Sequence, residues 1–389
     1  MTTTTDKTQI PAEELADDGS ATGVELEPAS DQIAEPFDPD EIKVTTRTMT
    51  VDLLMTRLAD GVLNLQPDFQ RKAGIWNDVK QSRLIESLVL RIPLPSFYVS
   101  ENDEEEWEVV DGVQRLTAIS RFVRPQSEDQ ALRLTGLEYL EGDFDRCRFE
   151  DLPLRLSRRI RETEFTFHVI ESNTPPLVRF NIFARINTGG MPLTHQELRH
   201  ALVPGKARVF LKLWAESESF QKAVDYGVKP DRMADREMVL RYFAFWNMPT
   251  PESYSRRDFG KFLMDAMKDM NKLSPGEEDE ARDTFESAMR VARAVFGRQA
   301  FRKKYSTGEP WRKPINRALF ESIAVNIANM TEEQQRQLVQ RSDKVVSAFV
   351  GLMNEQDFEA AVSVATGDPH KVQLRFARIR RMLKGVLNA

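Results

Sequence analysis

The sequence predicts two folded parts of different class, an α+β domain over residues 43–205 and an all-α domain over residues 206–389. Strand and helix periodicities both occur before residue 205, whereas only helical periodicity follows it. The strands of the first part are few and do not alternate with helices as βαβ units, which favours α+β over α/β. The length of 389 residues also favours two domains, since domains usually hold about 100 to 200 residues.

Residues 1–42 precede both parts and differ from them in charge. They hold twelve acidic residues and one Lys, so the other 347 residues carry a net +4 although the whole chain carries -7. A segment rich in Thr, Ala, Pro and acid with few aromatics is typical of disorder, and we predict an acidic disordered leader. The alternative is an acidic strand that competes with nucleic acid for a basic groove of the same molecule.

The elements of the first part follow from local patterns. Helical spacing over residues 50–59 and 76–90, followed by alternation over 95–100 and 107–110, predicts two helices and a β-hairpin. The hairpin feeds a helix that begins near Gly112. Further alternation over 164–172 predicts another strand, and residues 176–190 have helical spacing. The capping box of Thr194 and Glu197 begins one more helix.

The second part shows helical periodicity throughout. Thr331 with Gln334 forms a capping box, and Asp368 with Pro369 marks a helix start. The predicted helices span residues 206–218, 233–247, 258–270, 277–296, 316–329, 332–353 and 369–387.

Composition excludes several classes of protein. Cys147 is the single cysteine and the four His are scattered, so an internal disulfide and a Cys/His zinc site are not expected. No apolar run reaches the ~18 residues of a membrane span, and no signal peptide opens the chain. We expect a cytoplasmic protein that does not enter a membrane.

The stretch Asp111-Gly112-Val113-Gln114-Arg115 places polar side chains at a strand-to-helix turn. Val113 can face the core, whereas Gln114 points away from it. A cation in the first turn of a helix is mildly disfavoured unless an anion binds there, and the amides of a helix start together with a guanidinium form an anion site. The alternative is that Asp111 pairs with Arg115 and only fastens the turn.

Four blocks, in order, resemble the N-terminal domain of GmrSD-type modification-dependent restriction enzymes, which is related to the ParB and sulfiredoxin fold. The blocks are Pro67-Asp68-Phe69-Gln70-Arg71; Trp76 with Lys80, Ser82, Leu84-Ile85-Glu86-Ser87 and Ile92-Pro93-Leu94-Pro95; Asp111 to Thr117; and Phe183 to Gly190 with Leu193 and Glu197-Leu198-Arg199. The chain departs from the family's D-G-Q-Q-R motif at Val113.

The resemblance implies a nucleoside triphosphate site that controls DNA restriction or phage defence. It implies catalytic roles for Asp111, Gln114 and Arg115. The nucleotide-binding residues that it implies are Gln70, Arg71, Lys80, Gly112, Thr117 and Asn187. Mg²⁺ is expected if the nucleotide is hydrolysed, although no ligand set for a metal is evident in the sequence.

Better known members of the family carry a C-terminal HNH nuclease, whose His/Asn pattern this chain does not show. DNA cleavage would therefore need the first domain or a partner nuclease or another subunit of the defence system. The segment 298–317 is rich in Arg and Lys interleaved with aromatic residues, which is typical of a DNA-binding surface. Its predicted DNA contacts are Arg298, Arg302, Lys303, Lys304, Arg312 and Lys313.

Two functions from different classes remain open. One is an NTPase, with or without endonuclease action, in a restriction system. The other is a non-catalytic, ParB-like adaptor that senses a nucleotide or docks on DNA.

Overall fold

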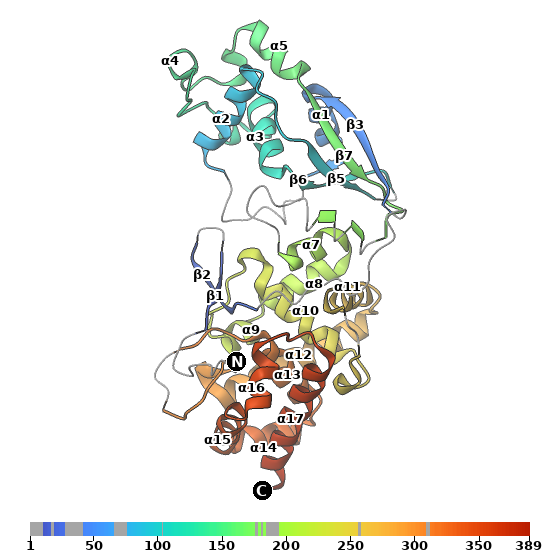
Figure 1. Ribbon diagram of the computed structural model, residues 1–389, viewed down its shortest axis with the longest axis vertical. Coiled ribbons are helices and arrows are strands. Elements are labelled where there is room, and N and C mark those ends of the chain that lie inside the picture. The colour runs from blue at the N-terminus through green and yellow to red at the C-terminus, as the bar shows by residue number, and fades with distance from the viewer. Residues whose placement is uncertain are drawn as a thin grey trace, which may run out of the picture. The chain divides into compact units, whose positions relative to one another are not determined.

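The computed structural model describes residues 11–16, 19–27, 42–65, 76–102, 104–175, 178–179, 182–183, 194–255, 258–308 and 312–389. Two compact units divide the chain, one of residues 37–193 and one that combines residues 1–36 with 194–389. The first is an α+β unit and the second is mainly helical, which confirms the predicted fold class (Figure 1). Within the described residues, no helix is both long and apolar enough to cross a membrane.

The α+β unit is built on a five-stranded mixed sheet with strand order β3-β7-β5-β6-β4. β7 pairs antiparallel with β3 and parallel with β5, and β5 and β6 form the predicted hairpin. The strands are β3 (Val44–Thr50), β4 (Leu63–Asn64), β5 (Phe97–Glu101), β6 (Trp107–Asp111) and β7 (Glu164–Ile170). The helices are α1 (Val51–Ala59), α2 (Asp78–Val89), α3 (Val113–Val123), α4 (Glu141–Phe144) and α5 (Leu154–Glu162).

Large apolar side chains of alternate strand residues form the core of this unit. Phe97 and Phe167 stack with ring centroids 5.0 Å apart, and Trp107 packs beside Phe167 at 6.0 Å. Leu116 and Ile119 of α3 are fully buried in the same cluster. Because α3 directs its apolar face into this cluster, the turn before it keeps Asp111, Gln114 and Arg115 in fixed places.

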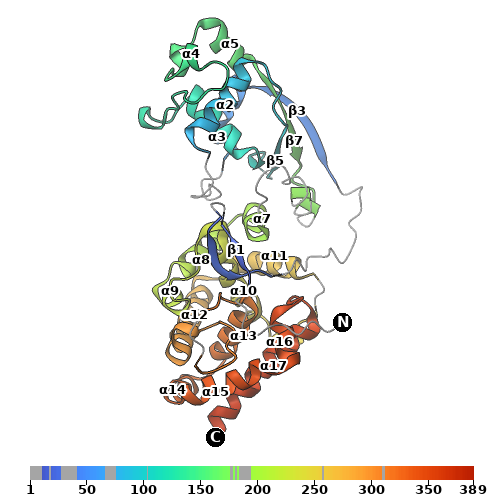
Figure 2. The same ribbon diagram turned by 60° about the vertical axis from the view of Figure 1, so that its left-hand side comes forward.

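The helical unit extends from α7 to the C-terminus. α13 packs against both α10 and α12 within it (Figure 2). Phe285 of α12 stacks on Trp214 and Phe220. Its helices are α7 (His195–Leu202), α8 (Lys206–Ala215), α9 (Glu218–Ala223), α10 (Ala234–Trp246), α11 (Phe259–Met270), α12 (Pro275–Phe296), α13 (Arg317–Ala328), α14 (Glu332–Gln340), α15 (Ser342–Met353), α16 (Gln356–Ser363) and α17 (Pro369–Asn388). The compact units divide between residues 193 and 194, so α7 packs with this unit and not with the one predicted to end at residue 205.

The prediction of a disordered leader is wrong for residues 11–16 and 19–27. They form β1 (Glu13–Leu15) and β2 (Ala21–Glu25), an antiparallel pair that belongs to the helical unit. Glu25 donates its N–H to the carbonyl of Ile315, and Ile315 donates its own to the carbonyl of Gly23, each at 2.8 Å. Composition alone suggested disorder because it ignores partners that lie about 290 residues away in the chain.

Two further elements differ from the sequence predictions. The expected helix over 332–353 breaks between α14 and α15 at Arg341, whose Nη1 donates to the carbonyls of Val386 and Leu387 at 2.6 and 2.9 Å. The break therefore places a cation where the last turn of α17 has carbonyls without helical partners. The sequence did not predict β3. Most residues of this strand, VTTRTMT, are exposed and polar, so they form no apolar pattern.

Glu86 of α2 is a buried carboxylate that holds the chain after α3. It accepts N–H groups from Glu138, Tyr139 and Leu140 at 2.9, 2.7 and 2.8 Å. Burial raises the pKa of Glu86, but these three hydrogen bonds outweigh burial, so the pKa lies below its ordinary value.

We predict that Glu86→Gln lowers the free energy of unfolding by about 1–3 kcal/mol, since a charged acceptor of three N–H groups becomes a neutral amide. A lowered folded-state pKa gives stability that is present above the unfolded pKa and lost as the pH falls through the folded one. The variant should therefore lose less stability than the wild type below about pH 4.3, the ordinary glutamate value. Urea unfolding at several pH values measures this, and parallel pH profiles would contradict it.

Candidate functional site

The turn between β6 and α3 forms the centre of the candidate site. Gly112 is the residue before α3 and has φ 100°. A Cβ atom at this position would lie 2.2 Å from Cδ1 of Phe97 and 3.1 Å from Nη2 of Arg115. Glycine is required here both for the left-handed backbone and for the space that Phe97 occupies.

Arg115 is buried and binds three oxygen atoms around this turn. Its Nη2 donates to Asp111 Oδ2 at 2.9 Å and to the carbonyl of Ser96 at 3.1 Å, while Nη1 donates to the carbonyl of Pro95. The guanidinium also lies over the Phe97 ring, 4.4 Å from its centroid. Burial lowers the pKa of Arg115 from its ordinary value, and the Asp111 carboxylate opposes that shift. The ion pair expected from the sequence is therefore present, with loop carbonyls as additional partners.

Gln114 and Thr117 lie one turn apart on α3. Gln114 Oε1 accepts a hydrogen bond from the N–H of Trp76 at 3.1 Å. The carbonyl of Trp76 accepts a hydrogen bond from Gln81 Nε2 at 2.5 Å. Gln114 therefore fastens the start of the α2 segment to α3. The buried Thr117 hydroxyl has no hydrogen-bond partner among the described residues.

The remaining nucleotide-binding predictions have different outcomes. Lys80 lies in the first turn of α2 with an exposed side chain, and its backbone N–H is capped by Asn77 Oδ1 at 2.9 Å. Gln70, Arg71 and Asn187 lie outside the described residues. The sequence did not indicate the carbonyls of Pro95 and Ser96 or the ring of Phe97, because backbone acceptors and a ring carry no motif. The prolines of residues 92–95 were the one feature of the sequence that could have drawn attention to this loop.

The predicted DNA-binding segment 298–317 is largely internal. Arg302, Lys303 and Lys313 are 2%, 5% and 1% exposed, so the prediction of a direct DNA contact is wrong for these three. Arg302 donates to the carbonyls of Lys313 and Val224, and Lys303 binds Glu25 at 2.6 Å. These cations bind buried carbonyl and carboxylate oxygens. A count of charges along the sequence does not reveal such partners.

The exposed members of that segment keep the DNA prediction open. Arg298 and Arg312 have side chains 72% and 38% exposed, and each pairs with Asp225, at 3.0 and 3.2 Å. Lys304 is partly exposed.

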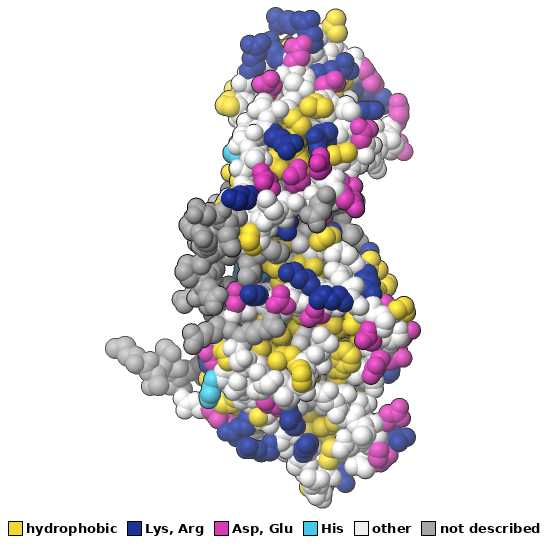
Figure 3. Space-filling model, turned by 90° about the vertical axis from the view of Figure 1, so that its right-hand side faces the viewer, with side chains coloured by type: hydrophobic (Ala, Val, Ile, Leu, Met, Phe, Trp, Pro, Cys, Tyr) yellow, Lys and Arg dark blue, Asp and Glu magenta, His cyan; other side chains and the backbone are white. Residues whose placement is uncertain are grey.

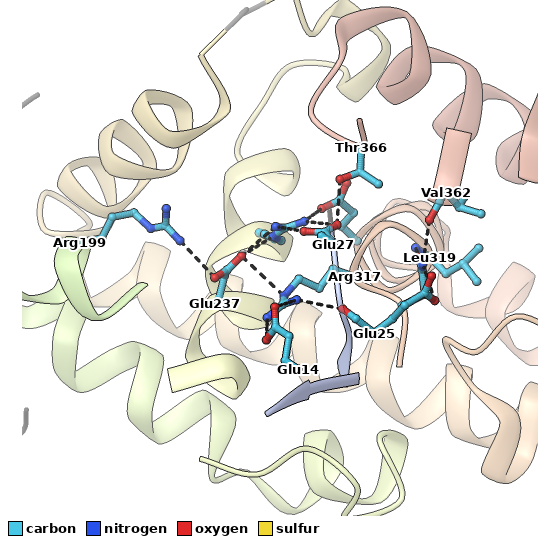
Figure 4. Close-up of polar contacts among 12 residues, drawn as sticks. Glu14, Glu25, Glu27, Arg199, Glu237, Arg317, Leu319, Val362 and Thr366 are labelled. Atoms are coloured by element: carbon cyan, nitrogen blue, oxygen red, sulfur yellow. Dashed lines mark hydrogen bonds and ion pairs between the residues drawn. The ribbon is translucent and has the colours of Figure 1, made fainter. Parts of the chain in front are cut away.

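The acids of the N-terminal hairpin bind a cluster of arginines in the helical unit (Figure 4). Glu14 meets Arg317 through both carboxylate oxygens at 2.7 Å each, and Glu27 meets Arg241 at 3.2 and 2.5 Å. Gly23 allows this close docking, since a Cβ atom there would lie 1.6 Å from the carbonyl oxygen of Gly227.

The cluster joins four guanidiniums to carboxylates of the helices and of the N-terminal strands. Arg199, Arg241 and Arg317 pair with Glu237, and Arg375 pairs with Glu321, which also lies 3.8 Å from Arg241. Glu14 and Glu27 add two carboxylates, at Arg317 and Arg241. Burial raises the pKa of Glu27, but Arg241 and Arg317 outweigh it and hold that pKa below its ordinary value. The acidic strand considered from the sequence does occupy a basic cluster, and its competition with nucleic acid stays a prediction.

We predict that Glu27→Gln destabilises the helical unit by on the order of 3 kcal/mol, because it leaves the buried Arg241 with less compensation. Glu333→Gln is the control, since Glu333 forms a surface pair with Arg336 and its loss should cost less than about 0.5 kcal/mol. Thermal unfolding of both variants measures the difference. Equal effects would mean that the hairpin does not contribute to the fold.

Comparison with known families matches residues 54–204 to the GmrSD restriction endonuclease, N-terminal domain. The match contains the site around Asp111 and Arg115 and leaves residues 1–53 and 205–389 uncovered. No curated protein matches the chain significantly.

Proposed function

Because residues 54–204 match the GmrSD restriction endonuclease, N-terminal domain, we propose that this chain is a nucleotide-binding component of a DNA restriction or phage-defence system. The site between β6 and α3 is the nucleotide site of the proposal, and Arg115 is the residue that contacts phosphate. The observation that carries the proposal is a guanidinium at a helix start, held there by one carboxylate and two carbonyls.

A phosphate group would find two kinds of donor at this turn. The first amides of α3 have no helical partner. Arg115 lies in the same turn, and guanidinium binds phosphate oxygens through two parallel hydrogen bonds.

Asp111 serves two purposes in the proposal. It holds Arg115 at 2.9 Å and so keeps the guanidinium at the turn before nucleotide binds. Its side chain is 35% exposed, so one carboxylate oxygen is accessible to solvent. Mg²⁺ commonly binds one or two carboxylates and takes its other ligands from nucleotide phosphates and water, so Asp111 fits that role. The ion would neutralise charge on the phosphates.

Gln114 Oε1 is bonded to the N–H of Trp76, so a contact of Gln114 with phosphate would come from its Nε2 amide. Its role in the proposal is to fix the segment that begins at Trp76. The proposal therefore assigns nucleotide binding to Arg115. The bound nucleotide would either be hydrolysed or be sensed without catalysis, and both forms use the same site.

We predict that Arg115→Ala weakens nucleotide binding about 10- to 100-fold, the effect of losing one charged hydrogen-bonding group. Calorimetric titration of the purified chain with ATP, GTP, CTP and UTP, each with Mg²⁺, measures it. Arg124→Ala is the control, since Arg124 lies at the exposed end of the same helix. Circular dichroism confirms that both variants are folded.

Phosphate release assayed on the same samples separates the two forms. Turnover that Arg115→Ala abolishes identifies an NTPase, and saturable binding without turnover identifies a sensor. Failure of the wild-type chain to bind all four nucleotides would reject the proposal and leave the Asp111–Arg115 pair as a fastening of the turn.

A further inference from the structure

A second candidate site in the α+β unit is an open groove of about 770 Å³ beside α5. Its walls are the last turn of α2 with the loop that follows, α5, and the start of β7. The charged residues of its lining are Arg91, Arg155, Arg158, Arg159, Glu162 and Glu164. No residue of this groove belongs to the site at Asp111.

The groove has an excess of positive charge. Four guanidiniums face two carboxylates, and Glu162 pairs with Arg158 at 3.6 Å in an exposed ion pair that is weak in water. Arg159 donates from Nη1 to the carbonyl of Val89 at 2.7 Å, which fixes its guanidinium against the end of α2. Figure 3 shows Lys and Arg side chains gathered at the end of the α+β unit where α5 lies.

Arg91 lines the groove in an unfavourable backbone conformation. It follows α2 with φ 61°, and the N–H groups of Arg91 and Ile92 bond the carbonyls of Leu88 and Ser87 at 3.2 and 2.8 Å. This is the Schellman ending of a helix, in which the left-handed position is usually glycine. A side chain at this position is less favourable for folding than glycine.

We propose that this groove binds the phosphate backbone of duplex DNA without reading its sequence. The inference rests on the proposed function, since a component of a restriction system acts on DNA. Guanidinium groups bind phosphates through pairs of hydrogen bonds. Because the groove is open, a DNA duplex could lie in it and extend beyond it on both sides.

An acidic peptide fits the groove less well than DNA. Extended peptides commonly bind by adding a strand to a free sheet edge. β7 lies between β3 and β5, so its main-chain groups are already paired on both sides. The groove therefore offers side-chain guanidiniums and no strand edge, which suits phosphates.

The loop after Arg91 also connects the groove with the site at Asp111. The groove is lined by four consecutive residues of this loop, Arg91 to Leu94. The carbonyls of the next two residues, Pro95 and Ser96, accept hydrogen bonds from Arg115. A nucleotide that draws Arg115 toward its phosphates would release these carbonyls. A change at the nucleotide site would therefore act on a loop that also lines the groove.

The experiment compares two arginines that share a backbone conformation. Arg91 and Arg146 both have φ 61° and belong to the same unit, but Arg146 does not line the groove, and its side chain is 88% exposed. Arg91→Gly and Arg146→Gly each remove one charge and place glycine at a left-handed position. Anisotropy of a fluorescein-labelled DNA duplex, titrated with the full-length chain at several salt concentrations, measures binding.

We expect Arg91→Gly to weaken binding equally for duplexes of unrelated sequence and to lower the slope of log K against log salt by about 0.9. Arg155→Gln with Arg158→Gln should lower the slope by about 1.8, the value for two phosphate contacts. Arg146→Gly should leave the slope unchanged. The melting temperature of Arg91→Gly should not fall, since glycine relieves the left-handed position.

Three outcomes would overturn the proposal. Equal losses in Arg91→Gly and Arg146→Gly would show a general charge effect, and no loss in Arg91→Gly would exclude the groove. Polyglutamate that binds the wild type, loses affinity in Arg91→Gly and leaves DNA binding unaffected would identify an acidic peptide site and would also reject it. Nucleotide titration of Arg91→Gly keeps the two hypotheses apart, because the site at Arg115 stays intact in that variant.

Discussion

The position of Arg115 links the parts of the α+β unit that matter for function. Its guanidinium reaches the last residue of β6 through Asp111 and the entry to β5 through the carbonyls of Pro95 and Ser96. One side chain thus joins the turn before α3 to the loop after α2, beneath the ring of Phe97. In the proposed function the same guanidinium binds phosphate, so a ligand at this turn would compete with contacts that hold the fold. Binding would then be coupled to local structure at this residue.

The helical unit depends on a different constraint, the balance of buried charge. Two of its buried arginines, Arg241 and Arg317, bind Glu27 and Glu14, which lie in the described segments 19–27 and 11–16. The chain therefore begins and ends in the same unit, with the α+β unit between the two segments. Removal of one carboxylate from such a network leaves a buried charge uncompensated, which costs more than the loss of a surface pair.

Local patterns predicted the elements whose signals are local. The start of α3 followed from Gly112 and the spacing of Leu116 and Ile119, and the capping boxes at Thr194 and Thr331 begin α7 and α14 as expected. Pairing at long sequence separation was not predictable in this way. Glu25 and Lys303 form an ion pair across 278 residues, so the leader looked disordered and the basic segment looked exposed. The site was found through Asp111 and Arg115, whereas its backbone acceptors at residues 95 and 96 carry no sequence signal.

The central claim is that nucleotide binds at Arg115 and releases the loop that Arg115 holds. Hydrogen exchange of the full-length chain, with and without saturating nucleotide and Mg²⁺, tests it most directly. The account predicts altered exchange in residues 91–97, which join the groove to Arg115, and in the first turns of α3. Saturable nucleotide binding that leaves exchange in both segments unchanged would contradict it.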